Sequence, residues 1–226
     1  MSEGSAAELR ERLAALKRNG CAILVTGAVP NEVYARACLR LFGDTREEVR
    51  RQLVVCTDRE PRDAFAKLPT QPSTAGERRK LVNHTVYSRS AGTAVSEPVP
   101  PVPEVVVNSS RLSELGIAIS SAITSFDEAA DGLEPAELRV CFDSLVPLVA
   151  DHDRERLFRF LHLLRGRIVQ VRGMGHFHLP RDPADEDVRV LSPLFDLVVE
   201  LRVHDGRPEQ RWLLRDADLE IGWFPL

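Results

Sequence analysis

Hydrophobic positions along the chain follow two patterns. Short continuous apolar runs bounded by glycine or polar residues, such as CAILVT at 21–26, predict strands buried on both faces. Longer segments with apolar residues at helical spacing, such as Val33, Ala37 and Leu41, predict amphipathic helices. The predicted strands are 21–26, 52–56, 81–87, 138–142, 174–179 and 197–203. The predicted helices are 5–18, 31–42, a short helix after residue 60, about 110–126, about 153–166 and 185–195.

Residues that begin or end helices stand at most of these boundaries. Asn31 is a candidate N-cap for the helix that Gly43 ends. Ser109 or Ser110 is the candidate cap of the third helix. Asp151 or Asp153 is the candidate cap of the fourth helix, which we expect to end at Gly166.

The order of these elements defines the fold class. Strand and helix alternate through most of the chain, and parallel strands need helical crossovers. We therefore expect a three-layer α/β fold with a mainly parallel central sheet flanked by helices. Segments 210–215 and 219–223 predict a C-terminal antiparallel hairpin. Residues 1–226 are interpreted as a single domain, with an irregular proline-rich insertion at about 69–104 whose prolines at 98–103 form an extended surface segment rather than a linker.

Charge and hydropathy narrow the class of protein. Lys and Arg number 30 against 34 Asp and Glu, a net charge of −4, which speaks against nucleic-acid binding through overall positive charge. No apolar run reaches the roughly 18 residues that span a bilayer, and the charged N-terminal segment lacks the apolar stretch of a signal peptide. We expect a cytoplasmic protein that does not insert into membranes.

The four cysteines contain no CxxC pair. Cys21, Cys38, Cys56 and Cys141 are far apart in sequence, and each lies in an apolar run. A thiol in such a run usually behaves as a small hydrophobic side chain. We therefore interpret the cysteines as core residues rather than metal ligands or disulfide partners.

The turn after the first strand occupies the place of a phosphate-binding loop, which reads G-x-x-x-x-G-K-[ST]. Gly27 matches the first glycine, and Asn31 precedes the second glycine position. Glu32 replaces that second glycine, Val33 the lysine and Tyr34 the metal-binding hydroxyl residue. The turn is therefore a degenerate Walker A loop. Valine removes a charge-assisted phosphate contact worth roughly 1.5–3 kcal/mol, although helix amides after Gly27 remain for weak anion binding.

A second motif is better preserved. The run LRVCFDS at 138–144 is a buried strand that ends in Asp143 and Ser144, the form of a Walker B strand whose aspartate holds magnesium. Asp143 read alone is equally consistent with a residue that caps the next turn.

Longer segments extend this likeness. The runs RVCFDSLVPLVADHDRERLF and GHFHLP, followed by LFDLVVEL, resemble the RecA superfamily and within it the KaiC-like ATPases. The likeness reaches forward to AILVTG and LVVCTDRE and covers roughly residues 5–226. Among these ATPases the chain resembles the KaiC-like paralogues of haloarchaea, many of which lack a usable phosphate loop.

The resemblance implies roles for several residues. It places Asp143 at the magnesium position, and Asp58 and Glu60 near the acids that position attacking water, although both are also interpretable as solvated loop acids. His176 and His178 fall on the sensor strand and alternate, so they share one face. An H-x-H pair can bind zinc or copper. No neighbouring Cys or His completes such a site in the sequence, so we favour local hydrogen bonding.

These features favour a non-catalytic RecA/KaiC-like domain that serves as a regulatory or protein-interaction module without a cofactor. The resemblance implies self-association or a protein partner. The alternative is a weak or unorthodox ATPase that binds magnesium and ATP. A third interpretation is nucleic-acid binding through the arginine-rich face of segment 154–165, which we otherwise expect to be a solvated helix face.

Overall fold

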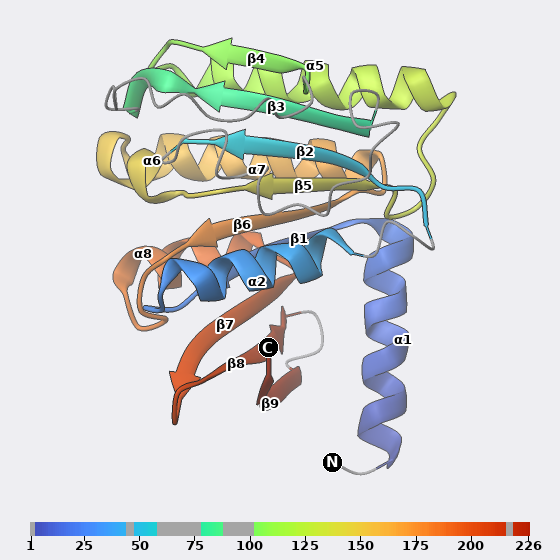
Figure 1. Cartoon of the computed structure of the whole chain (residues 1–226), viewed down its shortest axis with the longest axis vertical. Helices are drawn as coiled ribbons and strands as arrows, with labels where there is room; N and C mark the ends of the chain where they lie inside the picture. The colour runs from blue at the N-terminus through green and yellow to red at the C-terminus, as the bar shows by residue number, and fades with distance from the viewer. Residues whose placement is uncertain (1–2, 44–47, 58–77, 88–101, 216–218) are drawn as a thin grey trace.

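The computed structural model describes residues 3–43, 48–57, 78–87, 102–215 and 219–226. The described strands form one nine-stranded sheet in the order β4-β3-β2-β5-β6-β1-β7-β8-β9 (Figure 1). Their bounds are β1 Cys21–Thr26, β2 Arg51–Cys56, β3 Arg79–His84, β4 Glu104–Val107, β5 Leu138–Phe142, β6 Met174–Leu179, β7 Leu197–His204, β8 Arg207–Leu214 and β9 Leu219–Pro225. The strands from β4 to β7 in this order pair in parallel, and β8 and β9 extend the sheet in antiparallel fashion.

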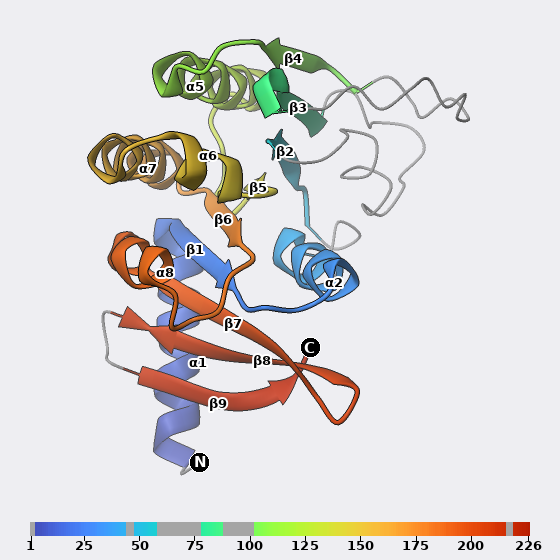
Figure 2. The ribbon, with the colours of Figure 1, turned by 90° about the vertical axis from the view of Figure 1, so that its left-hand side faces the viewer.

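Helices cover both faces of the sheet. Figure 2 shows α5, α6, α7 and α8 on one face and α2 on the other. Their bounds are α1 Glu3–Asn19, α2 Asn31–Phe42, α5 Leu112–Ala130, α6 Val146–Asp151, α7 Arg154–Gln170 and α8 Glu186–Leu191. Short 3-10 helices follow at η1 Thr85–Tyr87 and η2 Ser192–Leu194. This arrangement confirms the predicted α/β fold with a mostly parallel sheet and a C-terminal antiparallel hairpin.

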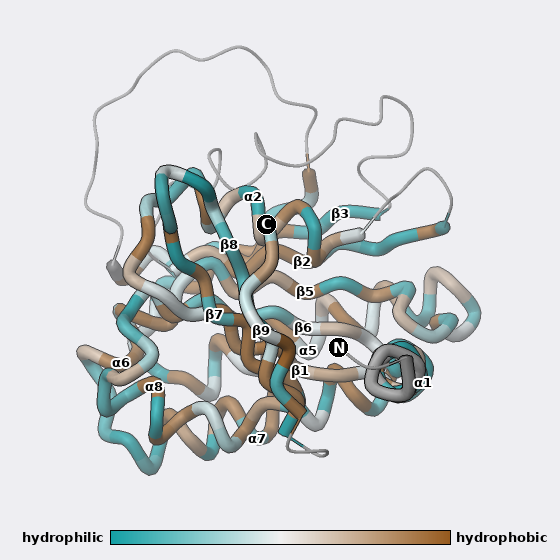
Figure 3. The backbone as a smooth tube through the Cα atoms, turned by 90° about the horizontal axis from the view of Figure 1, so that it is seen from below, coloured by the Kyte–Doolittle hydropathy of each residue, from teal (hydrophilic) through white to brown (hydrophobic). Residues whose placement is uncertain are grey.

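The largest part of the core lies between the sheet and the layer of α5 and α7. Phe142 and Phe177 point from β5 and β6 into this core, where Ile119 of α5 and Leu161 of α7 are also buried. In Figure 3 hydrophobic segments occur both on the strands and on the helices that cover them, whereas the turn of the β7–β8 hairpin is hydrophilic. Because strand side chains alternate between faces, Cys141 of β5 points to the opposite layer, beneath α2.

Several helix boundaries and caps differ from the sequence prediction. Helix α5 continues to Ala130, beyond the predicted 126, and α8 ends at Leu191, where the prediction continued to 195. Arg111 and not a serine occupies the N-cap position of α5, although the Ser109 hydroxyl accepts a hydrogen bond from the Arg111 amide at 3.2 Å. Pro30 precedes α2, so Asn31 is its first helical residue rather than its cap. Gly166 does not end α7, which continues to Gln170, because later apolar residues still pack against the sheet.

Other boundaries agree with prediction. Asp153 caps α7 by accepting a hydrogen bond from the Arg156 amide at 2.9 Å. Gly43 ends α2 with a φ of 77°. The short helix α6 was not predicted, because six residues are too few to establish a helical period.

Only part of the proline-rich insertion lies within the described residues. Its predicted strand at 81–87 is observed as β3 and the 3-10 helix η1. The Pro103 carbonyl accepts a hydrogen bond from the Leu81 amide at 2.9 Å, just before β4 pairs with β3. The prolines at 98–101 and the short helix expected after residue 60 lie outside the described residues. In the described part of the chain, no helix is long and apolar enough to cross a membrane.

Candidate functional site

The turn between β1 and α2 is fixed by close packing against β7. Gly27 has a φ of 136°, and a Cβ atom there would lie 2.2 Å from the Leu201 carbonyl oxygen. No side chain fits at that distance, so this position requires glycine. The Gly27 amide donates to the Arg181 carbonyl at 2.8 Å, and the Thr26 hydroxyl donates to the same carbonyl at 2.8 Å.

The side chains that replace the phosphate-binding residues turn into the core. Val33 and Tyr34 are 6% and 2% exposed, and both pack with β1 and β7. The Tyr34 hydroxyl donates a hydrogen bond to the Gly27 carbonyl at 2.7 Å, within the turn itself. Burial raises the pKa of Tyr34 above its ordinary value, so the phenol remains a donor. Glu32 is exposed.

Backbone amides of this turn are also engaged within the protein. The Val33 and Tyr34 amides both donate to the Pro30 carbonyl, at 3.0 and 3.4 Å. The Val29 amide donates to the Gly27 carbonyl at 3.1 Å. Anion binding at a helix N-terminus depends on amides that point at the ligand. The amides of Val33 and Tyr34, at the lysine and hydroxyl positions of the motif, therefore already have acceptors within the protein.

Asp143 connects two strand ends at the same edge of the sheet. Its Oδ1 atom accepts hydrogen bonds from the Thr57 amide at 2.8 Å and the Thr57 hydroxyl at 3.0 Å. Thr57 directly follows β2, and its hydroxyl also reaches the carbonyl of the buried Ser144 at 2.5 Å. The Ser144 hydroxyl accepts a hydrogen bond from the Val146 amide at 3.2 Å. Asp58 and Glu60 lie outside the described residues.

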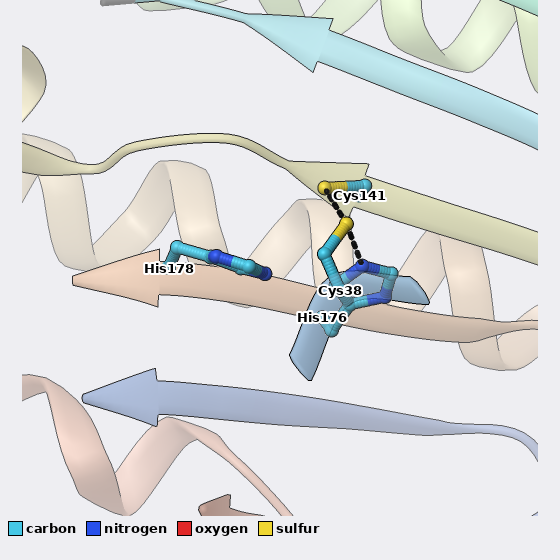
Figure 4. Close-up of side chains that lie close together, drawn as sticks. All are labelled: Cys38, Cys141, His176 and His178. Carbon is cyan, nitrogen blue, oxygen red and sulfur yellow. Dashed lines mark hydrogen bonds between the residues drawn. The ribbon is translucent and has the colours of Figure 1, made fainter. Parts of the chain in front are cut away.

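A second group of side chains meets beneath α2. Cys38 of α2, Cys141 of β5, and His176 and His178 of β6 place their potential ligand atoms within 4.8 Å of one another (Figure 4). We call these four residues the Cys2His2 cluster. The Cys38 sulfur lies 3.3 Å from the Cys141 sulfur and 3.3 Å from Nε2 of His176. Of the four, only Cys38 is partly exposed.

Burial and hydrogen bonding set the protonation states in the cluster. The hydrogen bond from the Cys141 thiol lowers the pKa of Cys38 well below its ordinary value, and the nearby His176 ring adds to this shift. The same hydrogen bond and burial raise the pKa of Cys141. Burial lowers the pKa of His176, which keeps this ring neutral.

Sequence reasoning identified half of this cluster. The alternation of His176 and His178 correctly placed both rings on one face. The partner of His176 is Cys38, which lies 138 residues away in the sequence. The cysteines are buried or partly buried, as expected of core residues. However, Cys38 and Cys141 are 103 residues apart, and no spacing rule indicated that they would meet beside the histidines.

The fold has known counterparts. The chain is similar to the KaiC-like protein PH0186 of the hyperthermophilic archaeon Pyrococcus horikoshii, with a TM-score of 0.54. The two share 11% sequence identity over 87% of this chain and 79% of the other. This likeness supports the RecA/KaiC-like fold expected from the sequence.

The family follows from the sequence itself. Residues 20–201 match DUF7504, a family of unknown function, and the chain belongs to it. This matched region includes the turn after β1, Asp143 and the whole Cys2His2 cluster. No curated protein matches the sequence.

Proposed function

We propose that this chain is a RecA/KaiC-like domain without ATPase activity that acts as a protein-interaction or regulatory module. The observation that carries the proposal is the hydrogen bond from the Tyr34 hydroxyl to the Gly27 carbonyl. This bond joins α2 to the turn that follows β1, so the Tyr34 side chain fills the inside of that turn. A buried phenol stands where an active phosphate loop presents a small hydroxyl side chain toward the metal.

The chemistry of nucleotide binding also argues for this proposal. Val33 supplies no charge for the phosphates, and Glu32 places a negative charge at the start of the helix. Loss of one preorganised charge donor commonly costs a hundred- to a thousand-fold in rate. Among the described residues, Asp143 stands at the magnesium position of the motif, but its Oδ1 atom already accepts hydrogen bonds from Thr57. The residues present therefore do not fit a magnesium nucleotide held as in active RecA/KaiC-like ATPases.

Thermal unfolding with and without magnesium and millimolar ATP tests the proposal. A ligand present at a hundred times its dissociation constant stabilises the native state by about 2.7 kcal/mol, which is a readable shift. We expect no shift of the midpoint and no ATP hydrolysis above the buffer rate. ADP and magnesium alone serve as controls.

The alternative is magnesium-dependent ATP binding, and the position of Asp143 at the end of β5 favours it. Under this alternative ATP raises the midpoint of the wild type, and Asp143→Asn abolishes the rise. Asparagine keeps an oxygen acceptor for Thr57 and removes the charge, so it separates metal binding from the structural role of Asp143. That pair of results would overturn the non-catalytic proposal.

A groove on the face of the sheet opposite α2 supports an interaction role. It lies along α5 and α7, which pack side by side (Figure 2), and it has a volume of about 1020 Å³. Ile117 and Leu163 line it and are 66% and 67% exposed. Large apolar side chains gathered around a groove are typical of protein-binding surfaces.

The charges beside this groove favour a second copy of the chain as the occupant. Arg111, Arg156 and Arg159 line the groove. Each forms an ion pair with a neighbouring acid, in the pairs Arg111–Glu114, Arg156–Asp153 and Arg159–Glu155. Both signs of charge therefore surround the apolar centre, and a two-fold axis can exchange partners between copies. The oligomeric state tests this part of the proposal.

A further inference from the structure

The Cys2His2 cluster has the donor set of a structural metal site. Two thiols and two imidazoles are typical zinc ligands, with Zn–S bonds of about 2.3 Å and Zn–N bonds of about 2.0–2.1 Å. In a tetrahedron these bonds place ligand atoms roughly 3.3–3.8 Å apart. The two sulfur contacts of Cys38 measure 3.3 Å, and all four ligand atoms lie within 4.8 Å of one another. The more distant ligand atoms need only approach from within 4.8 Å toward these spacings to complete the tetrahedron.

An independent feature points to a ligand at the same place. His178 is 4% exposed, and its Nε2 atom has no hydrogen-bond partner among the described residues. Buried polar atoms in native proteins nearly always have a partner. In Figure 4 the His178 ring extends along the sheet toward Cys38 and His176. A metal ion between these side chains would supply the partner that Nε2 lacks.

We propose that the Cys2His2 cluster binds one zinc ion. Four protein ligands would leave no open position, so the site is structural rather than catalytic. Soft sulfur donors also exclude magnesium as the natural occupant. The ion would connect α2 to β5 and β6, three elements that otherwise meet through side-chain packing. The partly exposed Cys38 gives the metal a route of entry.

The surroundings of the cluster suit such a site. The Phe42 ring packs edge-on against that of His176, with 4.9 Å between the ring centroids. The centroids of the Tyr34 and His178 rings are 5.5 Å apart. These aromatic rings limit water around the ligands, and an apolar shell of this kind strengthens metal–ligand interactions. Tyr34 also donates the hydrogen bond to Gly27 in the turn after β1, so one side chain contacts both the proposed metal site and that turn.

Metal analysis of the full chain, purified and kept under reducing conditions, tests the proposal. We expect one zinc per chain by elemental analysis after dialysis against zinc. Cobalt should give the thiolate charge-transfer and tetrahedral d–d absorption bands that two sulfur ligands produce. Cys38→Ser and His178→Asn should each raise the dissociation constant for zinc by at least about 100-fold, since loss of even an outer-shell partner costs 10–100-fold.

Cys21→Ser is the matched control, because Cys21 is buried on β1 outside the cluster. This variant should keep the full zinc content. The proposal is overturned if the wild-type chain binds no zinc and shows no cobalt charge-transfer band when reduced. It is equally overturned if iron or copper occupies the site in preference to zinc, or if the Cys38→Ser variant binds zinc as tightly as the wild type. The cobalt spectrum needs no variant and so remains decisive if a substitution prevents folding.

Discussion

Tyr34 changes the chemistry of the first turn through a single hydroxyl group. Its hydrogen bond to Gly27 is buried and measures 2.7 Å, and the ring also lies beside His178. One side chain therefore stabilises the turn and forms part of the boundary of the Cys2His2 cluster. The serine or threonine of an active loop is too small to do either.

Tyr34→Phe should destabilise the protein by about 0.5–1.5 kcal/mol, the usual net contribution of a hydrogen bond. The loss is limited because the Gly27 carbonyl still accepts a hydrogen bond from the Val29 amide. Urea unfolding at pH 7 measures the difference, and an unchanged midpoint would contradict the structural role of the hydroxyl.

The stability of the wild type and that of Tyr34→Phe should depend differently on alkaline pH. Burial raises the pKa of Tyr34 in the folded state above the unfolded value of about 10. The neutral phenol therefore favours the folded state fully below pH 10, and this contribution is lost as the pH rises toward the folded pKa. The advantage of the wild type over Tyr34→Phe should shrink above pH 10.

At the scale of elements, α7 is longer than its sequence suggests. Gly166 lies in the helix interior and is exposed, and a hypothetical Cβ there would meet no described atom within 4 Å beyond its chain neighbours and the backbone of its own helix. The expectation that it ends the helix failed because Ile168 and its neighbours continue the buried face. Tertiary packing thus outweighs the weak helix propensity of one glycine.

Gly166→Ala should stabilise the protein by roughly 0.5–1 kcal/mol, since alanine restricts the unfolded chain and suits a helix. Gly132→Ala is the contrasting control. Gly132 also has open space around it, but its φ of 100° follows the end of α5 and strains any L side chain. Calorimetric midpoints should therefore move in opposite directions, and a lower midpoint for Gly166→Ala would contradict the observed helix.

At the scale of the molecule, one continuous sheet places the two candidate surfaces on opposite sides. The Cys2His2 cluster lies beneath α2, whereas the groove of α5 and α7 lies on the other face (Figure 2). Self-association through the groove would leave α2 and the first turn accessible in each copy.

Light scattering over a range of concentrations tests this arrangement. The wild type should exceed the 25.2 kDa mass of one chain, and Ile117→Glu combined with Leu163→Glu should return the mass to that value. Val203→Glu is the control, because Val203 is 45% exposed on β7 outside the groove. A strictly monomeric wild type at high concentration, or a double variant that still associates, would contradict the proposal.

The sequence predicted the sheet better than the site. Strand β1 was predicted to the residue, because it is an unbroken, largely apolar run between clear boundaries. Strand β6 was also predicted to the residue, although two histidines interrupt its apolar pattern. The Cys2His2 cluster was not predictable in this way. Its formation depends on the register that places Cys141 opposite His176 and on the packing of α2 above both, and neither is encoded in local spacing.

The close contact between Gly27 and β7 bears on how this family evolves. A glycine at the head of the first turn is commonly taken as a relic of an ancestral nucleotide site. Here the backbone itself requires it, since a Cβ would lie 2.2 Å from the Leu201 carbonyl oxygen and the φ of 136° disfavours any other residue. Selection for this packing alone would keep the glycine in a chain that binds no nucleotide, so Gly27 by itself is no evidence for a nucleotide site.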